Sequence, residues 1–236
     1  MIRTLLVANR GEIACRIFST ARRLGIRTVA VYSEADAQAL HVKSADSAIC
    51  IGPASAADSY LNVEAVLAAA QQSAADAIHP GYGFLSENAN FAAACEQAGI
   101  IFVGPPAAAI STMGSKTAAK QLMQSAGIPI LPGYHGEKQD ADFLAAQADE
   151  IGYPLLIKAS AGGGGKGMRL VMKAAEFADQ LAGAKREAKS AFGDDVVLLE
   201  RYLTAPKHIE VQLMADQHGD VCLLYTSDAA DEYQRV

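Results

Sequence analysis

The sequence predicts an α/β protein built on a parallel, doubly wound sheet, and three observations support that class. Short β-branched runs alternate with longer stretches of helical periodicity through the first hundred residues, which is typical of strands joined by crossover helices. Hydrophobic residues make up 51% of the 236 positions, enough apolar material for a core. The chain is rich in alanine, a strong helix former, and contains no tryptophan, which favours a helix-rich enzyme over a β-sandwich.

Composition also excludes several classes of protein. The net charge is −6, so the basic face on which nucleic-acid binding depends is missing. No stretch of about 20 apolar residues suggests a membrane span. The apolar run Leu5–Ala8 is too short for a signal peptide. Because the cysteines form no CxxC pair, we expect a cytoplasmic protein without a zinc site or disulfide framework. These cysteines are Cys15, Cys50, Cys95 and Cys222.

The first half is expected to supply the parallel sheet. A helix over Glu12–Leu24 follows from Ile13, Ile17 and Ala21, which recur at helical spacing. Further helices are expected over Asn62–Gln72 and from about Asn88. Ligands of such sheets bind beyond the carboxyl ends of the strands, which here are followed by residues 9–12 and 79–83. The expected strands are Thr4–Ala8, Arg27–Tyr32, Ser47–Ile51, Asp76–His79 and Ile100–Val103.

Residues 104–106, Gly-Pro-Pro, mark a boundary, after which the pattern changes. Two apolar runs flank a glycine-rich stretch, which predicts a strand–loop–strand hairpin. The expected helices are Lys116–Ser125, Asp140–Glu150 and about Ala174–Ser190. The expected strands are Leu155–Lys158, Met168–Met172, Val196–Leu199 and His208–Met214.

The segment HPGYGFLSEN at 79–88 allows a structural and a functional interpretation. Its glycines permit a sharp turn, and Ser86 is expected to cap the following helix with Glu87 in the first turn. This structural account covers most of the segment. His79 and Glu87 as substrate-pocket residues are the secondary alternative.

The sharpest local signal is the glycine loop, residues 160–167, SAGGGGKG. Successive N–H groups in such a turn form a concavity that binds anions. It is not a Walker A loop, because Lys166 is followed by Gly167, and it is not a Rossmann fingerprint, because it joins two strands. We interpret it as a mobile flap over a ligand, with a disordered hairpin tip as an equally weighted alternative.

Charged residues near this loop are candidate ligand contacts. Lys158 ends a buried strand, where a cation is costly unless it meets an anion. Lys116 stands at an expected helix start that suits phosphate, although an ordinary solvated lysine explains it better when the residue is taken alone. The carboxylate of Glu200 is suited to accept a hydrogen bond from an exocyclic amine. A residue in a surface turn is the alternative interpretation. His208 is suited to bind a hydroxyl, with a structural role as the alternative.

Taken together, these motifs resemble biotin carboxylase in order and spacing, over residues 1 to about 222. The resemblance is closest to the biotin-carrying α subunit of an acyl-CoA carboxylase, of the 3-methylcrotonyl-CoA type as first choice. It is carried by ANRGEIACRI at the start, HPGYGFLSEN at 79–88, FVGPP at 102–106, MGSK at 113–116, GYHGE at 133–137, KASAGGGGKGMR at 158–169 and ERYL…HIEVQ at 200–212.

The resemblance implies a Rossmann-like pre-ATP-grasp domain over residues 1–112 and a truncated ATP-grasp domain over 113–222. A glycine-rich lid would span about 133–203. The implied ligase reaction activates bicarbonate with ATP and carboxylates carrier-bound biotin, using Mg²⁺ or Mn²⁺. A carboxyltransferase subunit and an oligomeric state in the complete protein are implied as well.

The resemblance also implies roles for single residues. The two lysines would bind ATP phosphates, the two glycines would donate lid N–H groups, and residues 200–203 would hold the adenine through the Glu200 carboxylate and main-chain groups. The implied ATP-binding set is Lys116, Lys158, Gly164, Gly165, Glu200, Arg201, Tyr202, Leu203 and His208.

Residues 223–236 do not resemble the family and are interpreted as a non-native tail. The family's catalytic residues and metal ligands have no counterpart in this chain, so we expect the chain alone not to turn over ATP. Two alternatives stay open: a non-catalytic nucleotide-binding fragment and another ATP-grasp ligase.

Overall fold

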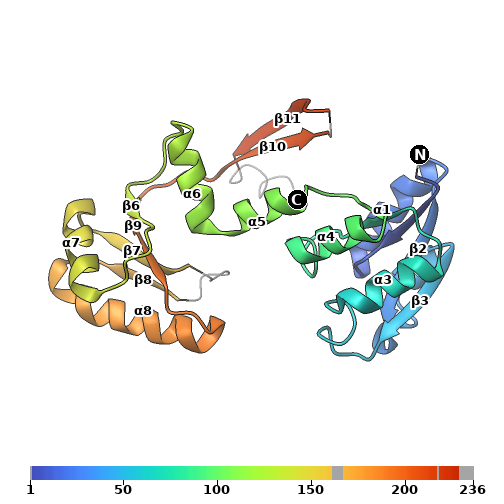
Figure 1. Ribbon diagram of the computed structural model, residues 1–236, viewed down its shortest axis with the longest axis horizontal. Helices are drawn as coiled ribbons and strands as arrows, with labels where there is room; N and C mark the ends of the chain where they lie inside the picture. The colour runs from blue at the N-terminus through green and yellow to red at the C-terminus, as the bar shows by residue number, and fades with distance from the viewer. Residues whose placement is uncertain (1, 161–166, 217, 229–236) are drawn as a thin grey trace. The chain divides into compact units, whose positions relative to one another are not determined.

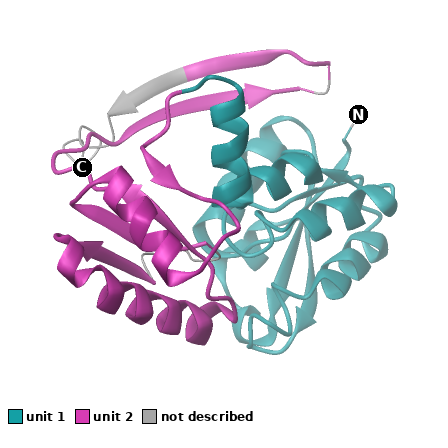
Figure 2. Cartoon of the chain, turned by 60° about the vertical axis from the view of Figure 1, so that its left-hand side comes forward, with its two compact units in different colours: residues 1–128 teal, residues 129–236 magenta. Residues whose placement is uncertain are grey.

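A computed structural model describes residues 2–160, 167–216 and 218–228 of the chain (Figure 1). The fold divides into two compact units, Met1–Ile128 and Pro129–Val236 (Figure 2). Each unit has its own sheet and its own hydrophobic core. The domain boundary expected between residues 112 and 113 stays a prediction.

The first unit is built on a five-stranded sheet with the order β3-β2-β1-β4-β5, and every strand pair is parallel. This confirms the predicted α/β class. The strands are β1 (Thr4–Val7), β2 (Arg27–Ser33), β3 (Ser47–Gly52), β4 (Ala77–His79) and β5 (Ile101–Phe102). The helices are α1 (Gly11–Arg23), α2 (Leu40–Ser44), α3 (Val63–Gln72), α4 (Ala89–Gln97), α5 (Ala107–Gly114) and α6 (Lys116–Ser125), with a 3-10 turn at Glu34–Asp36.

The central strand β1 is apolar from Leu5 to Val7 because both of its faces are covered there. Leu5 and Val7 belong to a core cluster with α1, whereas Leu6 belongs to a second cluster with α3 and α4. Successive side chains of a strand point to opposite faces, so an uninterrupted apolar run is what a doubly covered strand needs. The structure thus confirms the prediction that these apolar runs are buried strands.

Side-chain caps fix where several helices begin. Asn62 Oδ1 accepts from the backbone N–H of Ala65 at the start of α3, over 3.1 Å. The expectation that Ser86 caps α4 is wrong, because Asn88 takes that role and accepts from Phe91 N over 2.9 Å. Turn hydrogen bonds, including Ser86 N to the Gly83 carbonyl, delay the helix until Ala89.

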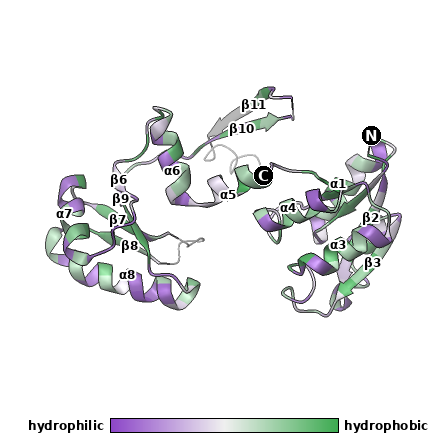
Figure 3. Ribbon diagram, viewed as in Figure 1, coloured by the Kyte–Doolittle hydropathy of each residue, from purple (hydrophilic) through white to green (hydrophobic). Residues whose placement is uncertain are grey.

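The second unit contains a four-stranded antiparallel sheet with the order β6-β9-β7-β8. Apolar side chains of α8 recur at helical spacing and are buried: Phe177, Leu181, Ala184 and Ala188. Figure 3 shows the corresponding mixture of hydrophobic and hydrophilic segments along this helix. The elements are β6 (Gly133–Tyr134), α7 (Ala141–Ile151), β7 (Leu155–Ala159), β8 (Met168–Val171), a 3-10 turn (Ala174–Glu176), α8 (Phe177–Phe192) and β9 (Val197–Arg201).

A separate two-stranded sheet ends the described chain. β10 (Ile209–Ala215) pairs antiparallel with β11 (Val221–Asp228). β11 was not expected, and it includes residues 223–228 of the segment interpreted as a tail. Residues 229–236 lie outside the described part of the chain. Several other elements were also not expected, namely α2, α5 and β6, because two-residue strands and short helices carry little periodicity.

Candidate functional site

Lys158 and Glu200 lie together on one face of the antiparallel sheet. β7 and β9 pair so that Leu156 faces Glu200 and Lys158 faces Leu198. Strand alternation therefore places both charged residues opposite the face where Ile157 packs with α7 and α8. We call this second side of the sheet the far face. The Nζ of Lys158 forms an ion pair with Oε2 of Glu200.

This ion pair is largely removed from solvent. The Lys158 side chain is 23% exposed and the Glu200 side chain 6%. Burying two charges costs more desolvation free energy than an ordinary surface pair returns. A pair in such a position supplies a fixed cation next to a fixed carboxylate, which is useful where an anionic ligand with amine donors must be oriented.

Sequence reasoning missed the apolar neighbours of this pair on the far face. In the β7–β8 ladder, Met168 pairs with Lys158 and Leu170 pairs with Leu156, so these side chains share the far face. Met168 and Leu170 are 46% and 40% exposed. β8 is only four residues long, too short for its sequence to show which side chains share this face. The far face therefore offers an apolar surface beside a cation.

The glycine loop joins β7 and β8, as the predicted hairpin requires. At its two ends, Ala159 N donates to the Gly167 carbonyl over 3.1 Å, and Ser160 N donates to the Val196 carbonyl over 2.9 Å. The two glycines expected to donate lid N–H groups, Gly164 and Gly165, lie outside the described residues. The ends of the loop are thus held next to Lys158.

The chain leaves the sheet after Arg201, at the end of the interior strand β9. Arg201 is the last residue of β9, and its guanidinium donates to the Ile151 carbonyl on the side opposite Glu200. Tyr202 N donates to the Pro154 carbonyl over 3.0 Å. Leu203 is 45% exposed. The Arg201 side chain is therefore engaged by Ile151 and does not lie beside the Glu200 carboxylate.

The remaining expected contacts come from other parts of the fold. Lys116 is the first residue of α6 in the first unit, directly after Ser115, whose Oγ accepts from Ala118 N over 3.3 Å. His208 precedes β10, and its Nε2 lies 3.7 Å from Oε1 of Glu210. Among the described residues, no three His, Cys, Asp or Glu side chains gather to hold a metal ion.

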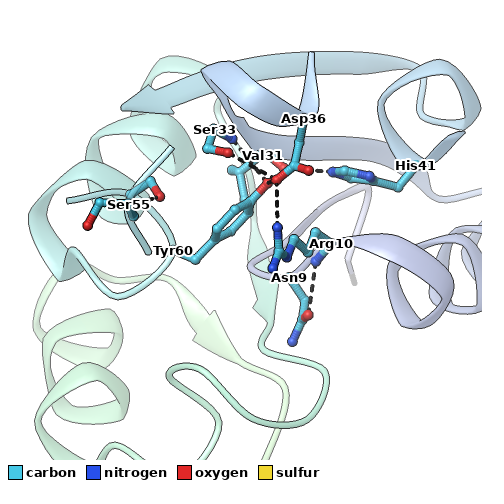
Figure 4. A network of polar contacts seen from close by, with 9 residues as sticks. Asn9, Arg10, Val31, Ser33, Asp36, His41, Ser55 and Tyr60 are labelled. Atoms are coloured by element: carbon cyan, nitrogen blue, oxygen red, sulfur yellow. Dashed lines mark hydrogen bonds and ion pairs between the residues drawn. The ribbon is translucent and has the colours of Figure 1, made fainter. Parts of the chain in front are cut away.

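A polar network fills the carboxyl ends of β1 and β2 in the first unit (Figure 4). Oδ2 of Asp36 accepts from Tyr60 OH at 2.7 Å, Ser33 Oγ at 3.0 Å and Arg10 Nη1 at 3.1 Å. Burial alone would raise the pKa of Asp36, but these hydrogen bonds outweigh it and lower the pKa. Burial, with the bond to Asp36, raises the pKa of Tyr60 to about 12.

Neighbouring contacts hold the segment after β4. The Arg10 guanidinium lies 5.3 Å from the ring centre of Tyr60 and 5.7 Å from that of Phe84, and the two rings stack. Asn9 Nδ2 donates to the carbonyls of Pro80 and Tyr82. Most of the polar and aromatic side chains described at this edge of the sheet are therefore engaged in contacts within the chain. A shallow hollow of about 410 Å³ beside it is lined by Phe84, Glu87, Asn88, Ala89 and Asn90.

The buried His41 beside this network predicts a pH dependence of folding. Its Nε2 lies 3.2 Å from the Val31 carbonyl, and Nδ1 has no hydrogen-bond partner among the described residues. Burial lowers the pKa of His41 below 6.5, although Asp36 nearby acts in the opposite direction. The unfolded chain then takes up the proton first, so stability is steady above about pH 6.5 and falls below it, by at most about 1.4 kcal/mol per pH unit.

Urea unfolding of the wild type and His41→Gln at pH 7.5, 6.0 and 5.0 measures this effect. The variant is expected to be less stable at pH 7.5 but to lose less stability on acidification. A residual slope of the same sign is expected from His79, whose pKa burial also lowers. Equal slopes for the two proteins would contradict the role of His41.

Two family models match the chain. The biotin carboxylase N-terminal domain matches residues 1–110, and the ATP-binding domain of the carbamoyl-phosphate synthase L chain matches residues 115–235. Among the described residues, no helix is long and apolar enough to cross a membrane.

Curated relatives agree with these matches. The mitochondrial methylcrotonoyl-CoA carboxylase subunit alpha of Arabidopsis thaliana is 57% identical over 97% of this chain and 31% of the relative. Biotin carboxylase 1 of Bacillus subtilis is 50% identical over 98% of this chain and 51% of the relative. The chain thus spans about a third to a half of the length of the curated relatives it matches.

Solved structures agree in fold as well. A biotin carboxylase–β,γ-ATP complex from Campylobacter jejuni superposes with a TM-score of 0.90 at 48% identity, covering 94% of this chain and 50% of that one. The biotin carboxylase domain of a Hydrogenobacter thermophilus 2-oxoglutarate carboxylase, in complex with MgADP, ADP and bicarbonate, gives 0.90 at 47% identity, covering 97% and 50%. The chain belongs to the biotin carboxylase family.

Proposed function

We propose that this chain forms the nucleotide-binding part of a biotin carboxylase, which carboxylates biotin with ATP and bicarbonate as the first half-reaction of an acyl-CoA carboxylase. The observation that carries the proposal is the Lys158–Glu200 pair on the far face, beside the ends of the glycine loop. The exposed Met168 on the same face suits one side of an aromatic base. A ligand that is part planar ring and part polyanion fits this combination.

In this proposal the two lysines neutralise phosphate charge. Phosphoryl transfer depends mainly on positioning and charge neutralisation, and Lys158 is already held in place by strand β7 and by Glu200. Lys116 offers a second cation at a helix start. The Glu200 carboxylate accepts from the adenine amino group, assisted by main-chain groups of residues 201–203. Gly164, Gly165 and His208 complete the proposed set.

Mg²⁺ or Mn²⁺ and biotin belong to the proposed reaction, but their protein ligands are not assigned to this chain. The described residues hold no cluster that could bind a metal ion. The ATP complexed in one structural relative, and the magnesium salt and bicarbonate in another, are consistent with that set of ligands.

The identities of the relatives favour one type of carboxyltransferase partner. Methylcrotonoyl-CoA carboxylase alpha subunits are 52–57% identical to this chain. A propionyl-CoA carboxylase alpha chain is 51% identical. We therefore propose a carboxyltransferase subunit of the methylcrotonoyl type as partner, together with carrier-bound biotin and an oligomeric complete protein.

A cytoplasmic location is proposed from the free cysteines among the described residues. The interpretation of residues 223–236 as non-native is retained as a proposal.

An assay of ADP release tests the function. A protein extended to the length of a complete biotin carboxylase is expected to hydrolyse ATP only when both bicarbonate and biotin are present. The 236-residue chain alone is expected to show no biotin-dependent hydrolysis. ATP hydrolysis by the extended protein that does not depend on biotin would favour another ATP-grasp ligase. Biotin-dependent hydrolysis by the 236-residue chain would contradict the proposal that this chain supplies only the nucleotide-binding part.

A further inference from the structure

A charged pair outside the proposed ATP set anchors one end of the glycine loop. Glu187 of α8 accepts from the backbone N–H of Gly167 through Oε1, over 3.1 Å. Its Oε2 lies 3.5 Å from Nη2 of Arg169 in β8. One carboxylate therefore binds both the last residue of the loop and the strand that follows it.

Gly167 is the residue at which β8 leaves the loop. Its φ of +69° lies in the left-handed region, and its carbonyl accepts from Ala159 N over 3.1 Å. A Cβ at this position would lie 2.9 Å from the Ala159 Cβ. This Ala159–Gly167 contact is the last rung of the β7–β8 hairpin, directly after the Lys158–Met168 pair.

Arg169 is itself held tightly against α8. Its Nη1 donates to Oε1 of Gln180 over 3.3 Å, and its buried Nε has no hydrogen-bond partner among the described residues. A Cβ on Gly183 would lie 2.8 Å from the Arg169 Cζ. A glycine inside a helix is less favourable than alanine. The guanidinium thus occupies space that only a glycine leaves open.

We propose that Glu187, acting with Arg169, is a positioning residue that fixes the last β7–β8 rung and thereby the Lys158 ammonium group for ATP phosphate. This inference rests on the proposed ATP-binding function. β8 is an edge strand of the sheet, and among the described residues its first end is held by the β7 ladder on one side and by contacts to α8. Prior ordering of a binding group increases affinity because less ordering is needed when the ligand binds.

Hydrogen exchange tests the geometric half of the proposal without any ligand. The Gly167 amide is expected to exchange about tenfold faster in Glu187→Ala, as loss of a hydrogen bond of about 1.4 kcal/mol gives. Glu187→Gln, which keeps one acceptor, is expected to fall between this variant and the wild type. The matched control is Glu176→Gln, because Glu176 accepts from Met172 N over 3.3 Å beyond the other end of β8. Unchanged Gly167 exchange in Glu187→Ala overturns the proposal.

ATP affinity tests the functional half, measured well below the melting temperature of each variant so that a purely structural role does not register. The dissociation constant of the 236-residue chain for ATP is expected to rise about three- to tenfold in Glu187→Gln and to stay at the wild-type value in Glu176→Gln. Equal affinity of Glu187→Gln and wild type overturns the positioning role. If the wild type itself binds no ATP, the proposed function fails instead, and Gly167 exchange alone decides whether Glu187 fixes the rung.

Discussion

Replacing Lys158 by methionine is expected to raise the KM for ATP of a complete carboxylase containing these residues by about 10- to 100-fold. The physical reason is the loss of a charge-assisted contact to phosphate, which is worth about 1.5–3 kcal/mol. Methionine keeps most of the length of the side chain, so packing on the far face changes little. Steady-state ADP release over a range of ATP concentrations measures the effect.

The matched control is Lys173→Met, which removes an exposed lysine just beyond β8. Its KM for ATP is expected to match the wild type. Lys158→Met is also expected to melt at a lower temperature, because the buried Glu200 carboxylate loses its ion pair. A variant that melts earlier but keeps the wild-type KM would show that Lys158 has a structural role only.

Replacing Asp36 by alanine is expected to destabilise the first unit by about 2–4 kcal/mol. The carboxylate accepts three hydrogen bonds, and the donors from Tyr60 and Ser33 lie in largely buried surroundings. Its removal leaves these donors without their acceptor. Because hydrogen bonds lower the pKa of Asp36, its contribution is present above about pH 3.8 and is lost as the pH falls through the lowered pKa.

Urea unfolding at pH 7.5 measures this loss. Asp36→Asn, which keeps one acceptor oxygen, is expected to lose less stability than Asp36→Ala. Asp58→Ala, at an exposed position in the loop before Tyr60, is expected to stay within about 0.5 kcal/mol of the wild type. A stability of Asp36→Ala close to that of Asp58→Ala would contradict the role assigned to the network.

The parallel sheet was predictable because burial on two faces requires uninterrupted apolar strands. Leu5 to Val7 carry that requirement in the sequence itself, since neighbouring residues enter different cores. The cap of α4 was not predictable in the same way. Ser86 and Asn88 are both good capping residues, and only the turns between Gly83 and Asn88 select the second of them.

For the candidate site, the sequence indicated single residues but not their arrangement, and their ATP-binding roles stay predictions. A lysine at the end of a buried strand indicates an anionic partner, and Lys158 has one in Glu200. The partnership itself depends on the register between β7 and β9, which joins residues 42 positions apart. The apolar contribution of Met168 and the anchoring contacts of Glu187 depend on register and helix packing too, so the sequence alone gave no sign of them.

Titration of the 236-residue chain with ATP by isothermal calorimetry, beside the same titration of Lys158→Met, tests the central claim most directly. We expect saturable binding of one ATP by the wild type and an affinity at least about tenfold lower in the variant. Absence of binding by the wild type, or the same isotherm for both proteins, would contradict the assignment of a nucleotide site to the far face of the β6-β9-β7-β8 sheet.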